Sequence, residues 1–196
     1  MIKYDEIKNI IKIIEECSAV ALTFYKQKNL EVSIKDDNSP VTKADLEISR
    51  IATNKLSEMF PNDKIISEEN ITNLNQVDMT KYWLIDPIDG TKEFITKSGF
   101  FTINFALISN NKPVFGIICQ PTTSSIWFNH KNTAYKIVKT FNIKDAVELK
   151  PRTINCNKLN IICSSTNLQL GIKNWLNIIK PLKISDIGSS LKFCYL

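Results

Sequence analysis

The sequence lacks the features that mark secreted and membrane-spanning chains. Its 196 residues include only five cysteines, an odd number, and these are scattered without a CxxC pair. This spacing predicts reduced thiols rather than a disulfide framework. No apolar run approaches the ~20 residues of a membrane span, and the polar N-terminus, MIKYDEIKNI, has no signal-peptide core. We therefore expect a cytoplasmic chain with no membrane span.

A block of charge of one sign is also missing. The net charge of +5 comes from 25 basic and 20 acidic residues, and the lysines are spread along the chain. A nucleic-acid partner is not expected, because the sequence has neither a basic block nor an aromatic RNA-binding motif. A mild positive excess also suits a protein that binds phosphorylated metabolites, but charge alone does not choose between these partners.

The pattern of apolar residues predicts one domain with a layered α and β fold. Helical spacing covers Tyr4 to Lys28, and a second helix is expected after Thr42, its N-cap. Loops and edge strands are expected from Lys131 to Asn157, and helices over Gly171 to Ile179 and from Ser189 onward. Short apolar runs predict strands over Lys64 to Ser67, Tyr82 to Asp86, Phe101 to Ser109, Pro113 to Gln120, Ser125 to Asn129, Leu159 to Cys163 and Leu182 to Asp186.

One segment after a predicted strand carries two carboxylates and a glycine. Asp86 closes the strand and Asp89 lies three residues further on, so both side chains can point at one centre. A buried carboxylate is costly unless it meets a cation or hydrogen-bond donors. Gly90 permits close backbone approach, and Thr91 can open a helix whose free N–H groups would hold a phosphate. Such oxygen ligands are typical of Mg²⁺ sites.

Each acidic motif also has a simpler interpretation when it stands alone. The DPIDG segment can be only a turn with Asp89 as a helix cap. The pair Glu68 and Glu69 can be two solvated charges, and Asp37 to Asp45 can be an ordinary loop and cap. In this order and at these spacings, the three motifs together favour one shared site.

The motifs resemble those of one phosphatase superfamily. SPVTKAD, ISEEN and WLIDPIDGTKEF, followed by FTINFALISNNKPVFGIICQP, are similar to segments of the lithium-sensitive, Mg²⁺-dependent inositol monophosphatase superfamily. Lys92, Glu93 and the segment GSSLKF, Gly188 to Phe193, resemble its bacterial 3'(2'),5'-bisphosphate nucleotidases. The resemblance implies a five-layer α-β-α-β-α sandwich in one domain, residues 1–196. Its N-terminal lobe would cover about 1–150, and the start of its C-terminal lobe about 151–196.

The same resemblance implies an activity and roles for particular residues. The reaction would be removal of the 3'-phosphate from adenosine 3',5'-bisphosphate, a small phosphorylated nucleotide of sulfur metabolism, to give AMP. Catalysis would use Thr91, oriented by Asp45 to activate the attacking water, and Glu68. The substrate would lie near Ser189 and Lys192. Mg²⁺ would be bound by Glu68, Asp86, Asp89 and the carbonyl of Ile88, and the phosphate would contact Ile88, Asp89, Gly90 and Thr91.

Two departures from the family pattern shape these expectations. Relatives carry Ser-Arg-Ser-His where this chain reads Ser164-Ser165-Thr166, so the contact of that histidine with the nucleotide is not expected; the only histidine, His130, is expected at the surface. The family's Trp-Asp-Thr-Ala-Ala-Gly motif, which supplies the last metal-binding Asp, has no counterpart before Leu196. The chain is therefore expected to be C-terminally truncated, and to hold fewer than the two or three ions of the complete site.

Several interpretations stay open at this point. An inositol-phosphate phosphatase of the same superfamily is one alternative to the nucleotidase. A catalytically impaired remnant that binds metal and phosphate is another, favoured by the missing Asp. A homodimer is also left open, because dimers are common among the relatives.

Overall fold

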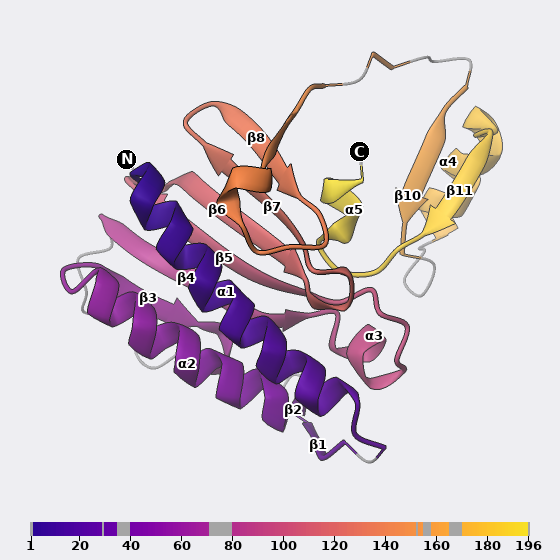
Figure 1. The fold of residues 1–196 in the computed structure, drawn as a ribbon. Helices are drawn as coiled ribbons and strands as arrows, with labels where there is room; N and C mark the ends of the chain where they lie inside the picture. Colours follow the sequence, from indigo (N-terminus) through magenta and orange to yellow (C-terminus); the bar gives the residue numbers. More distant parts are fainter. Residues whose placement is uncertain are drawn as a thin grey trace.

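The structure is a computed structural model, which describes residues 2–28, 30–34, 40–70, 80–151, 153–154, 158–164 and 170–195. Its centre is a seven-stranded sheet, with two long helices on one face (Figure 1). These helices are α1, Tyr4–Tyr25, and α2, Lys43–Met59. A short hairpin of β1, Val32–Ile34, and β2, Pro40–Thr42, leads into α2.

The large sheet has the strand order β3-β4-β5-β6-β7-β8-β9. Strands β3 and β4 are parallel, and every later neighbour is antiparallel, so most of the sheet is a meander. The bounds are β3 Lys64–Ser67, β4 Lys81–Asp89, β5 Thr102–Ser109, β6 Lys112–Gln120, β7 Ser125–His130, β8 Thr133–Ile137 and β9 Val147–Leu149. Short helical turns cover Glu68–Asn70, Pro121–Thr123 and Ile143–Asp145, and α3 is Thr91–Ile95.

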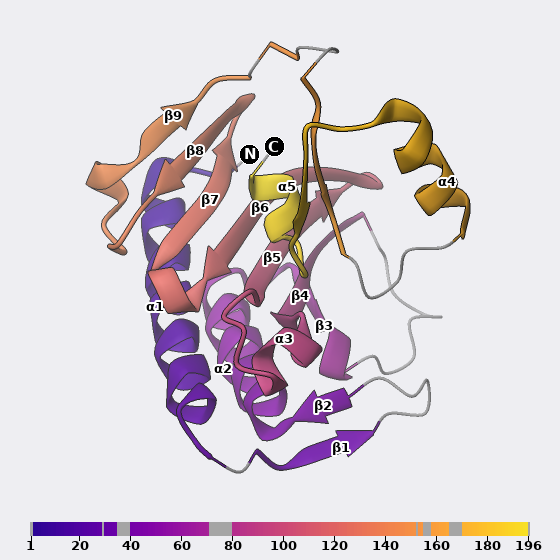
Figure 2. The same cartoon turned by 90° about the vertical axis from the view of Figure 1, so that its right-hand side faces the viewer.

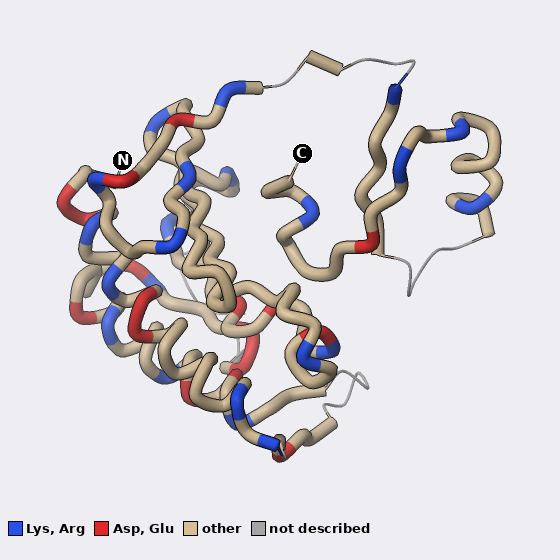
Figure 3. The backbone as a smooth tube through the Cα atoms, turned by 45° about the vertical axis from the view of Figure 1, so that its right-hand side comes forward, with Lys and Arg blue, Asp and Glu red and all other residues tan. Residues whose placement is uncertain are grey.

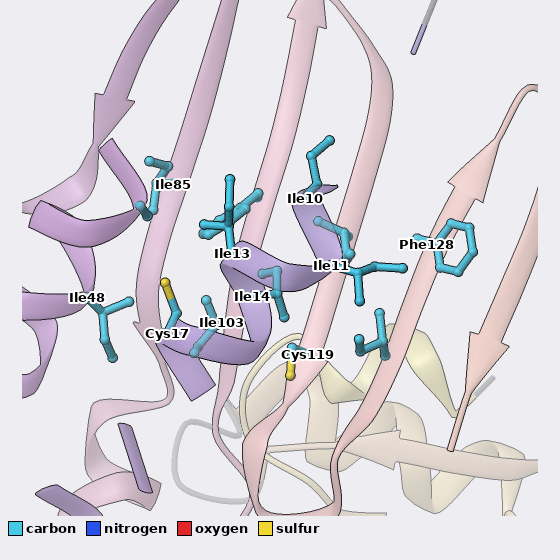
Figure 4. Close-up of a cluster of buried hydrophobic side chains, with 14 of the residues drawn as sticks. Ile10, Ile11, Ile13, Ile14, Cys17, Ile48, Ile85, Ile103, Cys119 and Phe128 are labelled. Carbon is cyan, nitrogen blue, oxygen red and sulfur yellow. The ribbon is translucent and has the colours of Figure 1, made fainter. Parts of the chain in front are cut away.

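The main hydrophobic core lies between the two long helices and the sheet. Figure 4 shows isoleucines of α1 meeting Ile85 and Ile103 from the strands, with Cys17 and Cys119 in the same layer. Trp83, Phe105 and Leu107 face the same core from alternate positions of β4 and β5. Because side chains alternate across a strand, the residues between them point to the opposite face of the sheet. That opposite face carries the polar residues described below.

The C-terminal part of the chain lies on the side of this second face (Figure 1). Strands β10, Asn160–Cys163, and β11, Lys183–Asp186, form a parallel two-stranded sheet with α4, Leu170–Ile179, beside it. The short helix α5, Leu191–Cys194, lies between this small sheet and the large one (Figures 1 and 2). The order is therefore helices, sheet, helix, sheet, helix, which confirms the predicted layered α and β architecture.

The helix predicted over Gly171 to Ile179 begins one residue earlier, at Leu170, and two other predicted helix boundaries differ by more than that. The first helix ends at Tyr25 rather than Lys28, and there the carbonyl of Tyr25 accepts a hydrogen bond from the Lys97 ammonium. The last helix begins at Leu191 rather than Ser189, because Ser189 has a φ of 52° in the left-handed region, which a helix does not use. The N-cap at Thr42 is confirmed.

The strands predicted from short apolar runs are found with small shifts at their ends. The largest shift is in β4, which extends from Tyr82–Asp86 to Lys81–Asp89. The less patterned region after Lys131 holds β8 and β9 at the edge of the sheet, as expected.

Charged residues are distributed in a mixed pattern. Figure 3 shows lysines and arginines interleaved with acidic residues along the backbone. In the part of the chain that the structure describes, no helix is long and apolar enough to cross a membrane.

Candidate active site

A bulge in β4 brings the two aspartates of the DPIDG segment to one face of the sheet. Asp86 pairs with Asn104, and Asp89 pairs with Thr102, so three steps along β4 match two steps along β5. Residues three apart in a regular strand point to opposite faces, but one extra residue cancels this alternation. Pro87, which has no N–H to donate, lies within the bulge. The burial pattern agrees, because Ile88 joins the hydrophobic core.

Asp86 is a half-buried carboxylate with incomplete hydrogen bonding. Its Oδ1 atom is buried and has no hydrogen-bond partner. The pKa of Asp86 is raised from 3.8 to about 8, first by burial and then by the nearby charges of Asp89, Glu68 and Asp45, while a hydrogen bond from Asn104 opposes the rise. The predicted acidic residues are therefore close enough to repel one another. Such an uncompensated buried oxygen fits a cation.

Asp89 differs from Asp86 because one of its oxygens is surrounded by donors. Its Oδ2 accepts a hydrogen bond from the backbone N–H of Ser190. The amide of Asn104 donates to the same oxygen at 3.4 Å, and the hydroxyl of Thr102 lies at 3.5 Å. Neither Asn104, Thr102 nor Ser190 was singled out from the sequence. Their contact with Asp89 depends on strand register and on a turn far away in the sequence.

Asp45 lies at the buried start of α2. Its Oδ2 accepts hydrogen bonds from the backbone N–H of Thr42 at 2.8 Å and from the Thr42 hydroxyl at 2.5 Å. Burial raises the pKa of Asp45 from 3.8 to about 6, against the lowering effect of Thr42. The predicted partner, Thr91, makes its own hydrogen bond at 3.3 Å to the carbonyl of Ile88. The structure thus places each member of the predicted dyad on a different partner.

Glu68 begins the short helical turn that follows β3. The turn is fastened to α2 by the Ser49 hydroxyl, which donates to the Ser67 hydroxyl at 2.7 Å, and by Asn70, whose amide lies 3.4 Å from Ser49. Ser49 is one helical turn after Asp45, so one face of α2 contacts both acidic motifs. The sequence did not reveal this role for Ser49, because a serine inside a helix has no distinctive pattern.

The turn between β4 and α3 leaves the first backbone N–H groups of α3 without partners inside the helix. Gly90 has a φ of 90°, a conformation open to glycine at little cost. The first hydrogen bond of α3 runs from the N–H of Phe94 to the carbonyl of Gly90. The N–H groups of Thr91, Lys92 and Glu93 consequently have no partner inside the helix.

A polar cavity of about 250 Å³ opens beside this turn. It contains four of the predicted site residues, Asp89, Gly90, Thr91 and Ser189, together with Pro40, Lys92, Glu93, Ser164 and Gly188. Lys192 is not part of its lining, because its ammonium binds the carbonyl of Ser189 at 2.7 Å. A larger cavity of about 540 Å³ lies elsewhere on the sheet, between residues such as Phe105, Trp127 and Phe193, and holds none of the acidic site residues.

Glu93 and Gly188, two residues from separate motifs, meet at this cavity. A Cβ atom on Gly188 would lie 2.1 Å from Oε1 of Glu93. A Cβ atom on Gly90 would also be crowded, at 3.2 Å from Oε2 of Glu93 and from the Cβ of Ser189. The sequence singled out both motifs, but their contact is visible only in the folded chain.

The acidic residues fit one divalent cation better than several. Among the described residues there is no group of three or more His, Cys, Asp or Glu side chains that could hold a metal ion as it stands. Mg²⁺, however, commonly uses one or two carboxylates and completes its shell with water and substrate phosphate. Asp86 and Asp89 provide such a pair, and the unpartnered Oδ1 of Asp86 offers a ligand that no other group occupies.

Two parts of the predicted motifs lie outside the described residues. These are Ser165 and Thr166, where relatives carry a histidine motif, and Asp37 to Ser39 before β2. Ser164 itself lines the polar cavity. His130 is half-buried at the end of β7, away from the acidic residues.

The fold and the acidic site together define a phosphatase family. The sequence pattern described as "Inositol monophosphatase family" matches residues 3–195, so the chain belongs to the inositol monophosphatase family. Members of this family are metal-dependent.

Curated relatives narrow the similarity further. The chain is 36% identical over 172 residues to the 3'(2'),5'-bisphosphate nucleotidase CysQ of Buchnera aphidicola, covering 87% of this chain and 63% of that protein. It is 33% identical over 191 residues to CysQ of Haemophilus influenzae, covering 95% of this chain and 69% of that protein. The chain thus spans about two thirds of the length of these relatives.

Solved structures agree with this placement. CysQ of Bacteroides thetaiotaomicron superposes with a TM-score of 0.75 at 26% identity, covering 96% of this chain and 74% of that one. An IMPase/NADP phosphatase complexed with Mg²⁺ and phosphate gives a TM-score of 0.66 at 18% identity, covering 92% and 66%. The second likeness shows the shared fold alone.

Proposed function

We propose that the chain is a Mg²⁺-dependent phosphatase that removes the 3'-phosphate of adenosine 3',5'-bisphosphate to give AMP. One observation carries the proposal: Asp86 and Asp89 share a face beside the Gly90–Thr91 turn, and Asp86 keeps a buried oxygen without a partner. The similarity to CysQ proteins, which are named as nucleotidases, supports the choice of substrate.

The metal would be held by Asp86 and Asp89, with Glu68 and the carbonyl of Ile88 as further ligands. A bound Mg²⁺ ion supplies charge neutralisation for the phosphate and a more acidic water molecule. We propose one bound ion, because Asp86 and Asp89 provide two carboxylates and one oxygen without a hydrogen-bond partner. Burial and, after it, repulsion from neighbouring carboxylates raise the pKa of Asp86, and a bound cation would offset both.

The residues of the chain would position the phosphate and the attacking water. The phosphate would lie in the 250 Å³ cavity, where the backbone N–H groups after Gly90 would donate hydrogen bonds to it. Thr91 would orient the water, and Asp45 would accept its proton. A pKa of about 6 leaves Asp45 mostly ionised at neutral pH and basic enough for this role. The Thr91 hydroxyl must first turn away from the carbonyl of Ile88.

The leaving nucleotide would lie against Lys92, Glu93 and the turn at Ser189. These residues line the same cavity as Gly90 and Thr91, where the phosphate would bind. Lys92 is exposed and carries a charge that suits the second phosphate of a bisphosphate. An inositol ester offers that charge no second phosphate. Lys192 would contribute indirectly, by holding the carbonyl of Ser189.

Phosphate release tests the proposal directly. The chain should be assayed with adenosine 3',5'-bisphosphate and with inositol 1-phosphate at equal concentration, with Mg²⁺ and with EDTA. We expect Mg²⁺-dependent release and a clear preference for the nucleotide. Lys92→Ala should reduce that preference, whereas Lys112→Ala, on the far hairpin, should leave it unchanged. A preference for the inositol ester would instead favour the alternative phosphatase, and Mg²⁺ binding without release from either substrate would favour the impaired remnant.

A further inference from the structure

A chain of hydrogen bonds connects the turn before α5 to the acidic residues of β4. The hydroxyl groups of Thr102 and Ser190 lie 2.8 Å apart. The Ser190 hydroxyl lies 3.0 Å from Oδ1 of Asn104, to which it donates, and the Asn104 amide donates to Oδ2 of Asp89 at 3.4 Å. The backbone N–H of Ser190 donates to the same Asp89 oxygen. Residues more than 80 positions apart in the sequence thus form one network.

The network fixes the direction of the Asn104 side chain. An asparagine amide has a donor end and an acceptor end, and its neighbours decide which end points where. The Ser190 hydroxyl donates its proton to Oδ1 of Asn104, so the NH₂ group faces Asp89. A reversed amide would direct Oδ1 at the carboxylate of Asp89 and lose the hydrogen bond to it. Ser190 can keep this donor role because the Thr102 hydroxyl can donate its proton to the Ser190 oxygen.

This arrangement assigns different tasks to the two oxygens of Asp89. Oδ2 accepts hydrogen bonds from the Ser190 N–H and from the Asn104 amide, which use much of its acceptor capacity. Oδ1 is left as the atom available to a cation. Thr102 is fully buried, so water competes poorly for this part of the network. Asn104 also stands directly opposite Asp86 across the ladder.

We propose that Asn104 and Ser190 are positioning residues for the metal site: Ser190 orients the Asn104 amide, and Asn104 holds Asp89 so that Oδ1 faces the cation. This inference rests on the proposed metal site at Asp86 and Asp89. It adds that the site is completed by the turn at Ser189–Ser190. The ligand geometry therefore depends on how that turn docks onto β5.

Mg²⁺ affinity, measured by calorimetry on the substrate-free chain and repeated with Mn²⁺, tests the inference without relying on turnover. Loss of a hydrogen-bonding partner behind a metal ligand typically costs ~10–100-fold in affinity. We expect a loss of this size for Asn104→Ala and a smaller loss for Ser190→Ala. Ser190→Thr keeps the hydroxyl and should stay near the parent affinity. Asn104→Ala with Ser190→Ala should be no weaker than Asn104→Ala alone, because Ser190 acts through the amide.

Asn129→Ala is the matched control. Asn129 lies on β7 of the same sheet, and its side chain binds the backbone of Gly116 at 2.6 Å, away from the acidic residues. Its removal should lower the melting temperature without changing Mg²⁺ affinity. Melting in EDTA identifies any variant that fails to fold. If Asn104→Ala fails to fold, the positioning role is tested by comparing the Mg²⁺ affinities of Ser190→Ala and Ser190→Thr.

Asp89→Asn distinguishes failure of the proposed metal site from failure of the positioning role. If Asp89→Asn weakens Mg²⁺ binding but folded Asn104 and Ser190 variants bind like the parent, the positioning role is wrong and the metal site stands. If Asp89→Asn leaves the affinity unchanged, the metal site itself is wrong and the positioning role falls with it. Equal affinity of Ser190→Ala and Ser190→Thr would show that the hydroxyl does not orient the amide.

Discussion

Gly188 lies so close to Glu93 that a Cβ atom at position 188 would stand 2.1 Å from the glutamate Oε1. The contact joins the turn before α5 to the helix that follows the DPIDG segment. Both residues line the polar cavity. The shape of the cavity therefore depends on an absent side chain as much as on the groups that are present.

Gly188→Ala should destabilise the chain because the new methyl group cannot fit beside the carboxylate. An extra carbon in a packed contact costs about 1–3 kcal/mol, and the cost should lie at the lower end because the Glu93 side chain can move aside; thermal melting would detect it. The control is Gly171→Ala in α4, where nothing lies within 4 Å of the new atom. That change should be neutral or stabilise the helix by up to about 1 kcal/mol. Adding Glu93→Ala to Gly188→Ala should recover much of the loss; if it does not, the clash is not the cause.

Ser49 and Thr53, one turn apart on α2, should respond in opposite ways to loss of their hydroxyl groups. Ser49→Ala leaves the buried Ser67 hydroxyl without its partner, which costs about 1–3 kcal/mol. Thr53 already has a buried hydroxyl without a partner, so Thr53→Val should be neutral or stabilising. Chemical unfolding measures the free energy of unfolding of both variants. The double change Ser49→Ala with Ser67→Ala should recover part of the first loss, and equal destabilisation by Ser49→Ala and Thr53→Val would contradict the argument.

The stability of the metal-free chain should fall as the pH rises from about 4 to about 8. The pKa of Asp86 is raised from 3.8 to about 8, so in this window the folded state holds a proton that the unfolded state releases. Mg²⁺ favours the ionised carboxylate, so the increase in melting temperature on adding Mg²⁺ should grow with pH. Asp86→Asn should remove the dependence above about pH 6 in EDTA, whereas Asp45, whose pKa is raised from 3.8 to about 6, should still contribute below it. A parent chain whose stability in EDTA rises across this window would contradict the prediction.

Thr91→Ala and Asp45→Asn should each reduce turnover while the chain stays folded. General-base catalysis typically contributes ~10²–10⁴-fold, and Asn at position 45 keeps an acceptor oxygen for the cap at Thr42. If the two residues act as a unit, the double variant should lose little more than either single one. Thr96→Ala, at the other end of α3, is the control and should retain activity. Losses that multiply in the double variant would exclude a dyad.

The sequence predicted those parts of the site that follow from local order. The strand before Glu68, the cap at Thr42 and the helix start at Thr91 each have a signal within a few residues, and the structure has all three. The pairing of Asp86 with Asn104 has no such signal, because it depends on the register between β4 and β5. A single asparagine in an apolar strand looks like an exposed position.

Contacts between distant segments were beyond the reach of sequence patterns. Ser190 meets Asp89 across 101 positions, and the approach requires Ser189 to adopt a positive φ that no serine motif encodes. The predicted bond between Asp45 and Thr91 followed from resemblance alone, and the two side chains bind elsewhere in this structure.

The bulge in β4 makes the site depend on an irregularity of the strand as well as on the identities of its residues. Without the bulge, at the present spacing of three residues, regular alternation would turn either Asp86 or Asp89 towards α1 and α2. That side of the sheet is packed with isoleucines, where a charge has neither water nor a partner. Loss of the bulge would therefore disrupt two structures at once, by separating the acidic pair and by placing a charge in the hydrophobic layer. Substitutions at Pro87 or Ile88 that preserve the bulge would keep both aspartates on the same side.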